Sequence, residues 1–192
     1  MPFSLLPKVQ TPKLTDITTE HLHSWGVKLL MLDFDNTIVP YTTTVPTEEM
    51  ERWLRDMNQL PDIRLCIVSN SHNDRVPKFC RERDMEVITH AKKPFTKGIN
   101  ECLTKFGIDP GNAALVGDQI FTDTLGANAA GVTSILVKAI DNLSALFFAN
   151  GIAVSSLFST SCWILCSLTA SGSCKACSLA RSPFFSSLIF WN

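Results

Sequence analysis

The sequence predicts an α/β domain: a three-layer sandwich in which helices cover both faces of a parallel sheet. Short apolar runs of strand length occur at 27–33, 63–69, 86–89, 113–116 and 133–137. Segments with the periodicity of amphipathic helices alternate with these runs. Such alternation implies right-handed βαβ crossovers, so we expect a doubly wound sheet of five parallel strands in the order 3-2-1-4-5.

The first two runs, VKLLMLD at 27–33 and IRLCIVS at 63–69, are almost continuously apolar. This pattern is typical of strands buried on both faces of a parallel sheet. In a doubly wound sheet the ligand crevice opens at the carboxyl ends of strands 1 and 4, where the winding reverses. The residues that follow Asp33 and Val116 are therefore the first place to look for a functional site.

Two helices can be placed by their apolar stripes and end signals. Thr47 can cap the first, and its stripe consists of Met50, Trp53, Leu54 and Met57. The other is expected between Pro94 and Gly107, with one apolar face formed by Phe95, Ile99, Cys102, Leu103 and Phe106. Gly131 is expected to end a further helix in the same way as Gly107.

Length and charge limit the classes of protein to consider. A chain of 192 residues is long enough for one ordinary domain. The formal net charge of -1 and pI near 6.4 provide no basic surplus, so no nucleic-acid partner is expected. No secretory signal is evident near the start, which favours a cytoplasmic domain. Three cysteines within apolar segments are interpreted as reduced core thiols: Cys66, Cys80 and Cys102.

Four carboxylates are expected to converge on one edge of the sheet. Asp33 and Asp35 follow the first strand, and Asp118 and Asp123 follow the fourth. Carboxylates this close repel one another in a partly dry site unless a hard dication lies among them. Mg²⁺ is the ion that fits oxygen ligands and retained water.

The neighbouring strands end in groups that suit a phosphate. Ser69 and Asn70 follow the second strand and could hydrogen-bond phosphate oxygens. Lys93, beside Pro94 after the third strand, would supply positive charge, with Lys92 as the alternative. Each of these residues alone could be an ordinary turn residue. Their joint occurrence at adjacent strand ends is what indicates a site.

In this order the residues resemble the four motifs of the HAD phosphohydrolases: a DxDxT box, a Ser or Thr, a Lys and an acidic GDxxxxD. The strings LMLDFDNTIVP, CIVSN followed by Arg75 and Val76, AKKP and VGDQIFTDTLGAN resemble its YqeG-type, type IIIA branch. The eukaryotic relatives of that branch are mitochondrial phosphatidylglycerophosphate phosphatases. The resemblance implies a Rossmann-like HAD fold and covers 27–137.

Carried over to this chain, the resemblance implies a role for each acid. Asp33 would attack phosphorus, and Asp35 would protonate the leaving oxygen and then activate water. Asp118 would bind Mg²⁺ together with Asp33 and the backbone carbonyl of Asp35. Asp123 would hold metal-bound water or orient Lys93.

The spacing of the motifs bears on the substrate. The segment between the first two strands has room for a flap and one helix, and the segment before Lys93 for one helix and one strand, so no cap domain is expected. A capless site favours large or surface-bound phosphate esters. The resemblance selects a phospholipid head group, that of phosphatidylglycerophosphate, and a peripheral position at the membrane. Alternatives are a phosphoprotein or nucleotide phosphatase, and a non-catalytic domain that senses phosphate.

A change in composition divides the chain after residue 141. Residues 142–192 contain no acid, only Lys175 and Arg181 as bases, and four of the seven cysteines. We therefore expect a phosphatase domain at 1–141 and an atypical tail at 142–192, interpreted as out-of-frame translation. A membrane-associating segment near 145–168 is the alternative. The cysteine pairs of the tail could suggest a zinc site, but chance is preferred in so cysteine-rich a segment.

Overall fold

The computed structural model describes residues 4–141, which form a six-stranded, wholly parallel sheet. The strands are β1 (Val9–Thr11), β2 (Leu29–Leu32), β3 (Arg64–Val68), β4 (Glu86–Ile88), β5 (Ala113–Gly117) and β6 (Thr133–Val137). They lie in the order β1-β6-β5-β2-β3-β4. Without the edge strand β1 and read from the other side, the order is β4-β3-β2-β5-β6. When these five strands are numbered from β2 along the chain, this is the predicted order 3-2-1-4-5, which is confirmed.

The register aligns the carboxyl ends of the three central strands. Leu32, the last residue of β2, is paired with both Ile67 and Val116 on the flanking strands. One residue later, the Asp33 backbone N–H donates to the carbonyl of Val116 at 2.8 Å. The polar residues that follow β2, β3 and β5 therefore start from one edge of the sheet.

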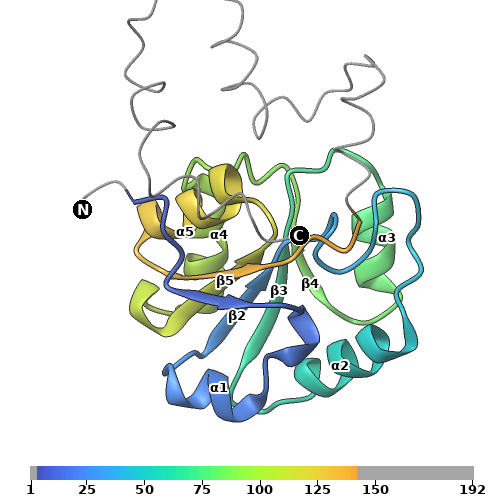
Figure 1. Ribbon diagram of the computed structural model, residues 1–192, viewed down its shortest axis with the longest axis horizontal. Coiled ribbons are helices and arrows are strands. Elements are labelled where there is room, and N and C mark those ends of the chain that lie inside the picture. The colour runs from blue at the N-terminus through green and yellow to red at the C-terminus, as the bar shows by residue number, and fades with distance from the viewer. Residues whose placement is uncertain (1–3, 142–192) are drawn as a thin grey trace, which may run out of the picture. The chain divides into compact units, whose positions relative to one another are not determined.

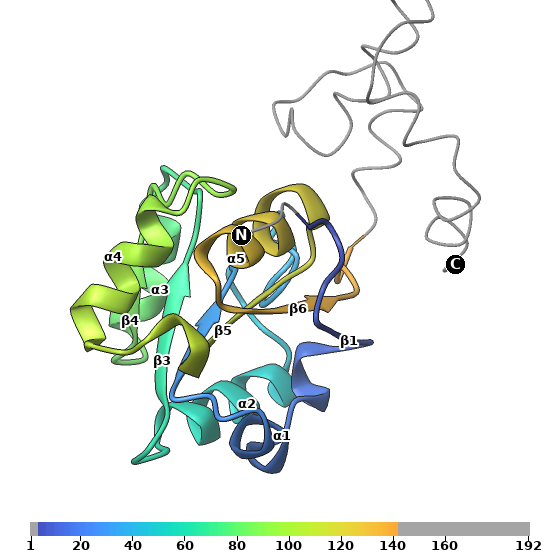
Figure 2. The same cartoon turned by 90° about the vertical axis from the view of Figure 1, so that its left-hand side faces the viewer.

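Helices cover both faces of the sheet and form three layers (Figures 1 and 2). On one face lie α1 (Thr19–Ser24), α2 (Glu48–Asn58) and α3 (Arg75–Arg81), and on the other α4 (Lys97–Phe106) and α5 (Leu125–Ala130). Leu30 and Leu32 of β2 belong to the first core, and Leu29 and Met31 to the second. This division follows from the alternation of side chains along a strand. Because β2 is buried on both faces, its sequence is apolar throughout.

The predicted helix signals are found at α2, α4 and α5. The Thr47 hydroxyl accepts a hydrogen bond from the backbone N–H of Met50 at 3.2 Å and caps α2. All four residues of the predicted α2 stripe are buried. Gly107 and Gly131 end α4 and α5 with φ of 64° and 78°, a conformation that glycine adopts without steric cost.

One predicted core residue is wrong, and one strand went unpredicted. Phe95 is 72% exposed, because α4 begins only at Lys97 and Phe95 precedes the turn that would have placed it on the buried face. The edge strand β1 pairs with β6. It was not predicted because three residues are too few to show the apolar periodicity of a strand. The three cysteines predicted as core thiols are buried and free.

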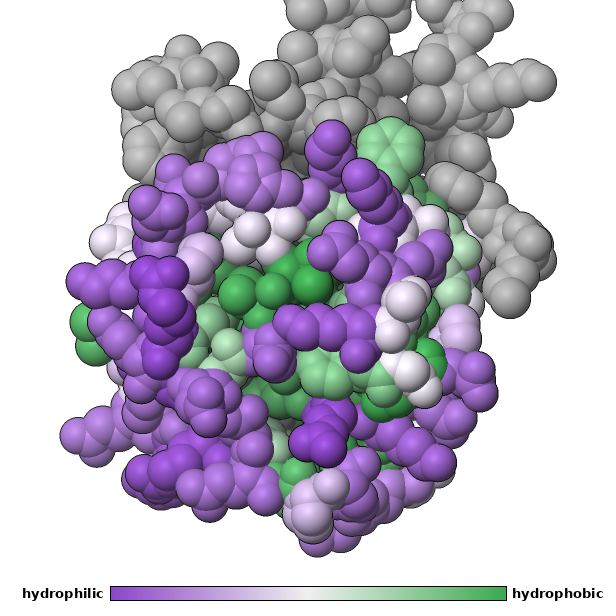
Figure 3. Space-filling view, turned by 180° about the vertical axis from the view of Figure 1, so that it is seen from behind, coloured by the Kyte–Doolittle hydropathy of each residue, from purple (hydrophilic) through white to green (hydrophobic). Residues whose placement is uncertain are grey.

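On the face seen in Figure 3 most of the described residues are hydrophilic, and apolar residues show between them near the middle of the view. The strongly exposed large hydrophobic residues are Leu6, Tyr41, Val45, Phe95 and Ile140. Within residues 4–141, no helix is long and apolar enough to cross a membrane. The predicted domain boundary and the whole predicted tail lie at or beyond the end of the described residues.

Candidate functional site

The centre of the site is a buried lysine between two buried aspartates. The Lys93 ammonium lies 2.6 Å from Asp33 Oδ1 and 2.6 Å from Asp123 Oδ1. The Lys93 side chain is 1% exposed, and those of Asp33 and Asp123 are 10% and 3% exposed. These residues follow β4, β2 and β5, so the fold brings them together from three strand ends.

Lys93 rather than Lys92 enters the site, and Asn70 helps to orient it. The Asn70 amide donates to the Lys93 carbonyl at 2.9 Å and accepts from the Lys93 backbone N–H at 2.7 Å. Lys92 is exposed and has a φ of 56°, an unusual value for a residue with a side chain. The amide that was expected to bind substrate therefore has a structural task, which is to fix the lysine backbone.

Asp118 and Asp123 follow β5 and are held by a close turn. The Asp123 carboxylate accepts a hydrogen bond from the Gln119 backbone N–H at 3.2 Å. Ile120–Thr124 form a single wide π-helical turn, a feature that is frequent at functional sites. A Cβ atom on Gly117 would lie 2.3 Å from the Asp123 carboxyl group, so glycine is required for this approach.

Three carboxylates form a group that fits a divalent cation. Asp33, Asp118 and Asp123 each offer an oxygen, and these oxygens lie within 4.8 Å of one another. The Oδ1 atom of Asp118 is buried and accepts no hydrogen bond from residues 4–141. With the three acids ionised and Lys93 protonated, the group carries two negative charges, which one divalent cation would balance.

Burial disfavours the ionised form of these acids when no cation is bound. Burial raises the pKa of Asp33 to about 7, although the adjacent Lys93 ammonium works against the shift. Burial and then the neighbouring carboxylates raise the pKa of Asp118 to about 8. For Lys93, burial would lower the pKa, but the carboxylates of Asp123 and Asp33 outweigh it and raise the pKa. The lysine therefore stays charged at neutral pH.

Asp35 lies at the same strand end as Asp33 but outside the group of three. Its carboxylate forms an ion pair with Arg75, the first residue of α3. Burial raises the pKa of Asp35, and Arg75 opposes that shift. Asp35, which the sequence predicted as a metal-site residue, thus contributes no side-chain oxygen to the cluster of Asp33, Asp118 and Asp123.

A small cavity of about 60 Å³ opens beside these residues. Of the residues predicted from sequence it is lined by Asp33, Asp35, Ser69, Asn70 and Lys93. At roughly 15 Å³ for each water-sized group, it has room for about four of them. That is enough for a phosphoryl group, while the rest of an ester would remain outside.

Sequence reasoning missed part of the cavity wall. Tyr41, from the flap between β2 and α2, lines it together with Gln119 and Thr122. The Gln119 amide donates to the Tyr41 hydroxyl at 3.3 Å and so joins the flap to the turn after β5. The sequence offered only one indication that these residues belong to the site, namely that the flap follows β2 and the turn with Gln119 follows β5.

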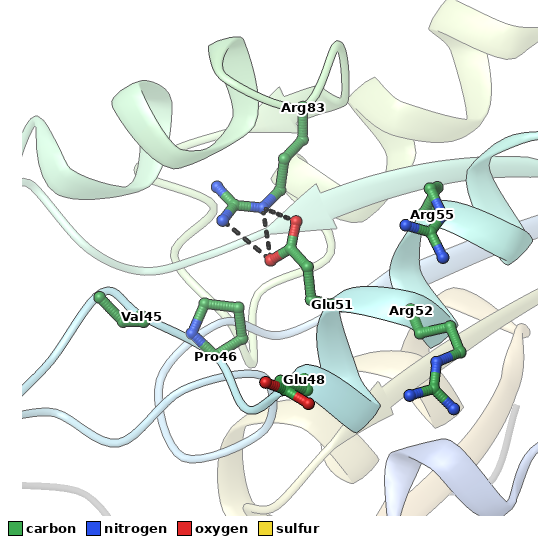
Figure 4. Close-up of a pocket in the computed structure, with 7 residues that line it drawn as sticks. All are labelled: Val45, Pro46, Glu48, Glu51, Arg52, Arg55 and Arg83. Atoms are coloured by element: carbon green, nitrogen blue, oxygen red, sulfur yellow. Dashed lines mark hydrogen bonds and ion pairs between the residues drawn. The ribbon is translucent and has the colours of Figure 1, made fainter.

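A larger groove of about 360 Å³ is formed by residues of α2, of the segment before it and by Arg83 (Figure 4). Its lining residues are Val45, Pro46, Glu48, Glu51, Arg52, Arg55 and Arg83. Glu51 and Arg83 face each other there and form a bidentate ion pair with distances of 2.9 to 3.1 Å. Among the described residues, none of the three clustered aspartates lines this groove, whereas Asp33 lines the smaller cavity, which is therefore the candidate site.

Comparison with known proteins agrees with this arrangement. Residues 1–140 match the profile of the family described as mitochondrial PGP phosphatase. The Bacillus subtilis protein named "Probable phosphatase YqeG" is 32% identical over 132 residues, which cover 69% of this chain and 76% of that protein. The family match, over residues 1–140, includes every strand end that contributes to the site.

Among solved structures at lower identity, one at a TM-score of 0.50 shows the same fold. A hypothetical protein from Xanthomonas campestris superposes with a TM-score of 0.50 at 14% identity, covering 76% of this chain and 79% of that one. The cobalt-bound deoxy-D-mannose-octulosonate 8-phosphate phosphatase from Haemophilus influenzae gives a TM-score of 0.45 at 17% identity, covering 73% and 98%. The two sequence matches show that the chain, whose four motifs resemble those of the HAD superfamily, belongs to the mitochondrial PGP phosphatase family and is a YqeG-type phosphatase.

Proposed function

We propose that this phosphatase is Mg²⁺-dependent and hydrolyses a phosphate monoester through a phosphorylated Asp33. The observation that supports this most strongly is the group of three carboxylates around one buried lysine, which would carry two uncompensated negative charges once its acids are ionised. Mg²⁺ held by Asp33, Asp118 and the carbonyl of Asp35 would supply positive charge next to the phosphoryl oxygens. Asp123, already engaged with Lys93, would keep that lysine in place or hold water on the ion.

In the first step a carboxylate oxygen of Asp33 forms a bond to phosphorus as the bond from phosphorus to the ester oxygen breaks. Lys93 occupies Oδ1 of Asp33, which leaves Oδ2 for the attack. Asp35 gives its proton to the departing alcohol oxygen. Lys93 and Ser69, both buried in the cavity wall, stabilise the charge on the phosphoryl oxygens.

In the second step water attacks the phosphorylated Asp33. Asp35, now a carboxylate, takes the proton from the water as the new bond to phosphorus forms. The bond between phosphorus and Asp33 breaks, which releases phosphate and restores the starting carboxylate. An acid two residues after the nucleophile thus carries the reaction through to free phosphate.

We propose phosphatidylglycerophosphate as the substrate, approached from a membrane surface. Its support is the family to which the chain belongs, the small cavity and several exposed hydrophobic side chains on segments that lead from the site. Tyr41 is exposed and lines the small cavity, and Phe95, two residues after Lys93, is exposed as well. Ile140 is also exposed, and its backbone N–H donates to the Asn36 carbonyl at 2.9 Å, beside Asp35. The cytoplasmic location stays a prediction.

A substrate panel tests this function. We expect Mg²⁺-dependent phosphate release, with kcat/KM at least about 10²-fold higher for phosphatidylglycerophosphate in vesicles than for a nucleotide, a phosphopeptide or glycerol 3-phosphate. A fragment ending at Asp141 should keep the activity on soluble esters, because residues 4–141 include a continuous core and the site residues named above.

Other results of the panel would point elsewhere. Equal or faster hydrolysis of the phosphopeptide or nucleotide would exclude the lipid as the preferred substrate. A stably phosphorylated Asp33 with no phosphate release would indicate a sensor. An inactive fragment beside an active full chain would show that the domain does not end at residue 141.

The raised pKa values predict how Mg²⁺ and pH act on stability. Asp33 and Asp118 have an ordinary pKa of 3.8, raised in the fold to about 7 and about 8. Without metal, the folded chain therefore retains protons that the unfolded chain has released. The free energy of unfolding should fall as pH rises from about 4 to about 8. Mg²⁺ replaces those protons, so it should stabilise the protein much more near the upper end of this range.

Thermal melting with EDTA and with Mg²⁺ across this range measures the effect. Asp118→Asn serves as the matched variant, because it removes one carboxylate of the group and should reduce the Mg²⁺-dependent rise in Tm. A Tm that is independent of Mg²⁺ at the alkaline end would contradict a cation site at these acids.

A further inference from the structure

One arginine connects the second aspartate of the DxD pair to the flap. From the first position of α3, an Arg75 guanidinium nitrogen donates to Asp35 Oδ1, and another donates to the backbone carbonyl of Tyr41 at 2.6 Å. The guanidinium carbon lies 5.1 Å from the centre of the Phe34 ring, between the two aspartates in sequence. A single side chain thus contacts the loop after β2 at three points.

The Arg75 contacts are sheltered from solvent. The side chains of Arg75 and Asp35 are 21% and 19% exposed. Phe34 beneath the guanidinium is fully buried and packs edge-on against Phe79 of α3, with ring centres 5.0 Å apart. Sheltered, charge-assisted contacts hold a side chain far more firmly than an ion pair at the open surface.

The stability of α3 does not account for an arginine at this position. The first turn of a helix presents unpaired backbone N–H groups and favours negative rather than positive charge. Arg75 places a cation there, so its favourable interactions must come from the loop after β2. Arg81, by contrast, lies in the last turn of α3, where the helix does favour a positive charge.

Arg75 also does not face the space where a phosphoryl group fits. Of the described residues, those lining the small cavity include Asp35 and Tyr41 but not Arg75. Because Arg75 takes Oδ1 of Asp35, Oδ2 is left for the ester oxygen. From this geometry we infer that Arg75 is a positioning residue, which holds Asp35 toward the leaving group and ties the flap to it.

The bridge requires arginine rather than positive charge alone. A guanidinium donates from separate nitrogens held in a rigid plane, so it can reach Asp35 and Tyr41 at once, whereas a lysine ammonium would have to serve both acceptors from one nitrogen. The flap residue it holds, Tyr41, is also contacted from the opposite side by Gln119. Loss of Arg75 would therefore loosen both the aspartate and the wall of the cavity.

The inference rests on the proposed function, in which Asp35 protonates the leaving oxygen. An alkoxide is a poor leaving group and needs that proton, whereas 4-nitrophenolate leaves readily without it. For this enzyme class kcat/KM reports the steps up to phosphorylation of Asp33. A misplaced Asp35 should therefore lower kcat/KM for an alkyl phosphate far more than for 4-nitrophenyl phosphate.

The test compares Arg75→Met, Arg75→Lys and the control Arg81→Met in the full chain. For Arg75→Met we expect kcat/KM to fall by about 30- to 100-fold with glycerol 3-phosphate, and by less than about 3-fold with 4-nitrophenyl phosphate. Arg75→Lys should lie between this variant and the wild type. Arg81→Met should match the wild type, because Arg81 is exposed and at the far end of α3.

Amide hydrogen exchange of the flap, residues 40–46, gives a second readout that needs no turnover. Exchange there should be faster in Arg75→Met than in the wild type and Arg81→Met, with the exchange of β2 and β5 unchanged. If the wild type shows no phosphatase activity, the proposed function fails, and flap exchange still decides whether Arg75 holds the loop.

Several results would overturn the inference. An equal loss on both substrates would indicate a general structural effect, and a rise in KM alone would indicate direct binding of the phosphate by Arg75. Full activity in Arg75→Lys would show that charge suffices without the bridge. Unchanged flap exchange in Arg75→Met would show that the contact to Tyr41 holds nothing in place.

Discussion

Asp33→Asn is expected to abolish phosphate release, with a loss in kcat of at least about 10⁴-fold. The amide lacks the anionic oxygen that forms the bond to phosphorus. It retains an oxygen that can accept from the Lys93 ammonium, now 2.6 Å from Asp33 Oδ1, so the fold should persist. Phosphate release with Mg²⁺, and mass spectrometry of the acid-quenched protein for a phosphorylated aspartate, measure the two consequences.

Asp109→Asn provides the matched control for this substitution. Asp109 is an exposed aspartate in the turn before β5, remote from the acid group, so its replacement should leave kcat unchanged. Mg²⁺-dependent turnover by Asp33→Asn within about 10-fold of the wild type would refute Asp33 as the nucleophile. Phosphorylation found on another aspartate would refute it equally.

Lys93→Met should affect both activity and stability. Losing the ammonium removes positive charge from the phosphoryl oxygens, and we expect kcat to fall by about 10³-fold. The variant also leaves Asp33 and Asp123 without their buried partner, which should lower the free energy of unfolding by about 3 to 5 kcal/mol in the absence of metal. Methionine nearly matches the length of the lysine stem, so packing should change little.

Denaturant unfolding with EDTA and with Mg²⁺ separates the two effects. Mg²⁺ should recover more stability in Lys93→Met than in the wild type, because the variant leaves three carboxylates without any cation. Lys92→Met is the control, since Lys92 is the exposed neighbour and should be neutral in both assays. If Lys92→Met were the inactive variant instead, the assignment of the site lysine would be wrong.

Much of the fold could be predicted from local patterns. The two-sided burial of β2 and β3 appears as continuous apolar runs, and the α2 stripe appears as helical spacing. Burial drives both patterns, and it depends mainly on each residue's own side chain. Phe95 marks the limit of this reasoning, because its position relative to the start of α4 is set by the turn after Pro94 and not by periodicity.

The candidate site was predictable as a set of strand ends but not as a set of contacts. The sequence could not show that the Asn70 amide is engaged by the Lys93 backbone. It also did not reveal that Asp35 pairs with an arginine forty positions away, since such a pair depends on how α3 packs beside the flap. Ion pairs between remote segments leave no periodic trace.

By itself the sequence determined the order of five of the six described strands, the edge of the sheet where the polar side chains lie and the acids found there. It could do so because alternating apolar runs and helices admit few arrangements, and parallel strands end together. Only the tertiary structure decided which lysine is buried, which three carboxylates approach within cation-binding distance and which arginine holds Asp35. These outcomes depend on backbone turns and side-chain rotamers that packing selects among near-equal local alternatives.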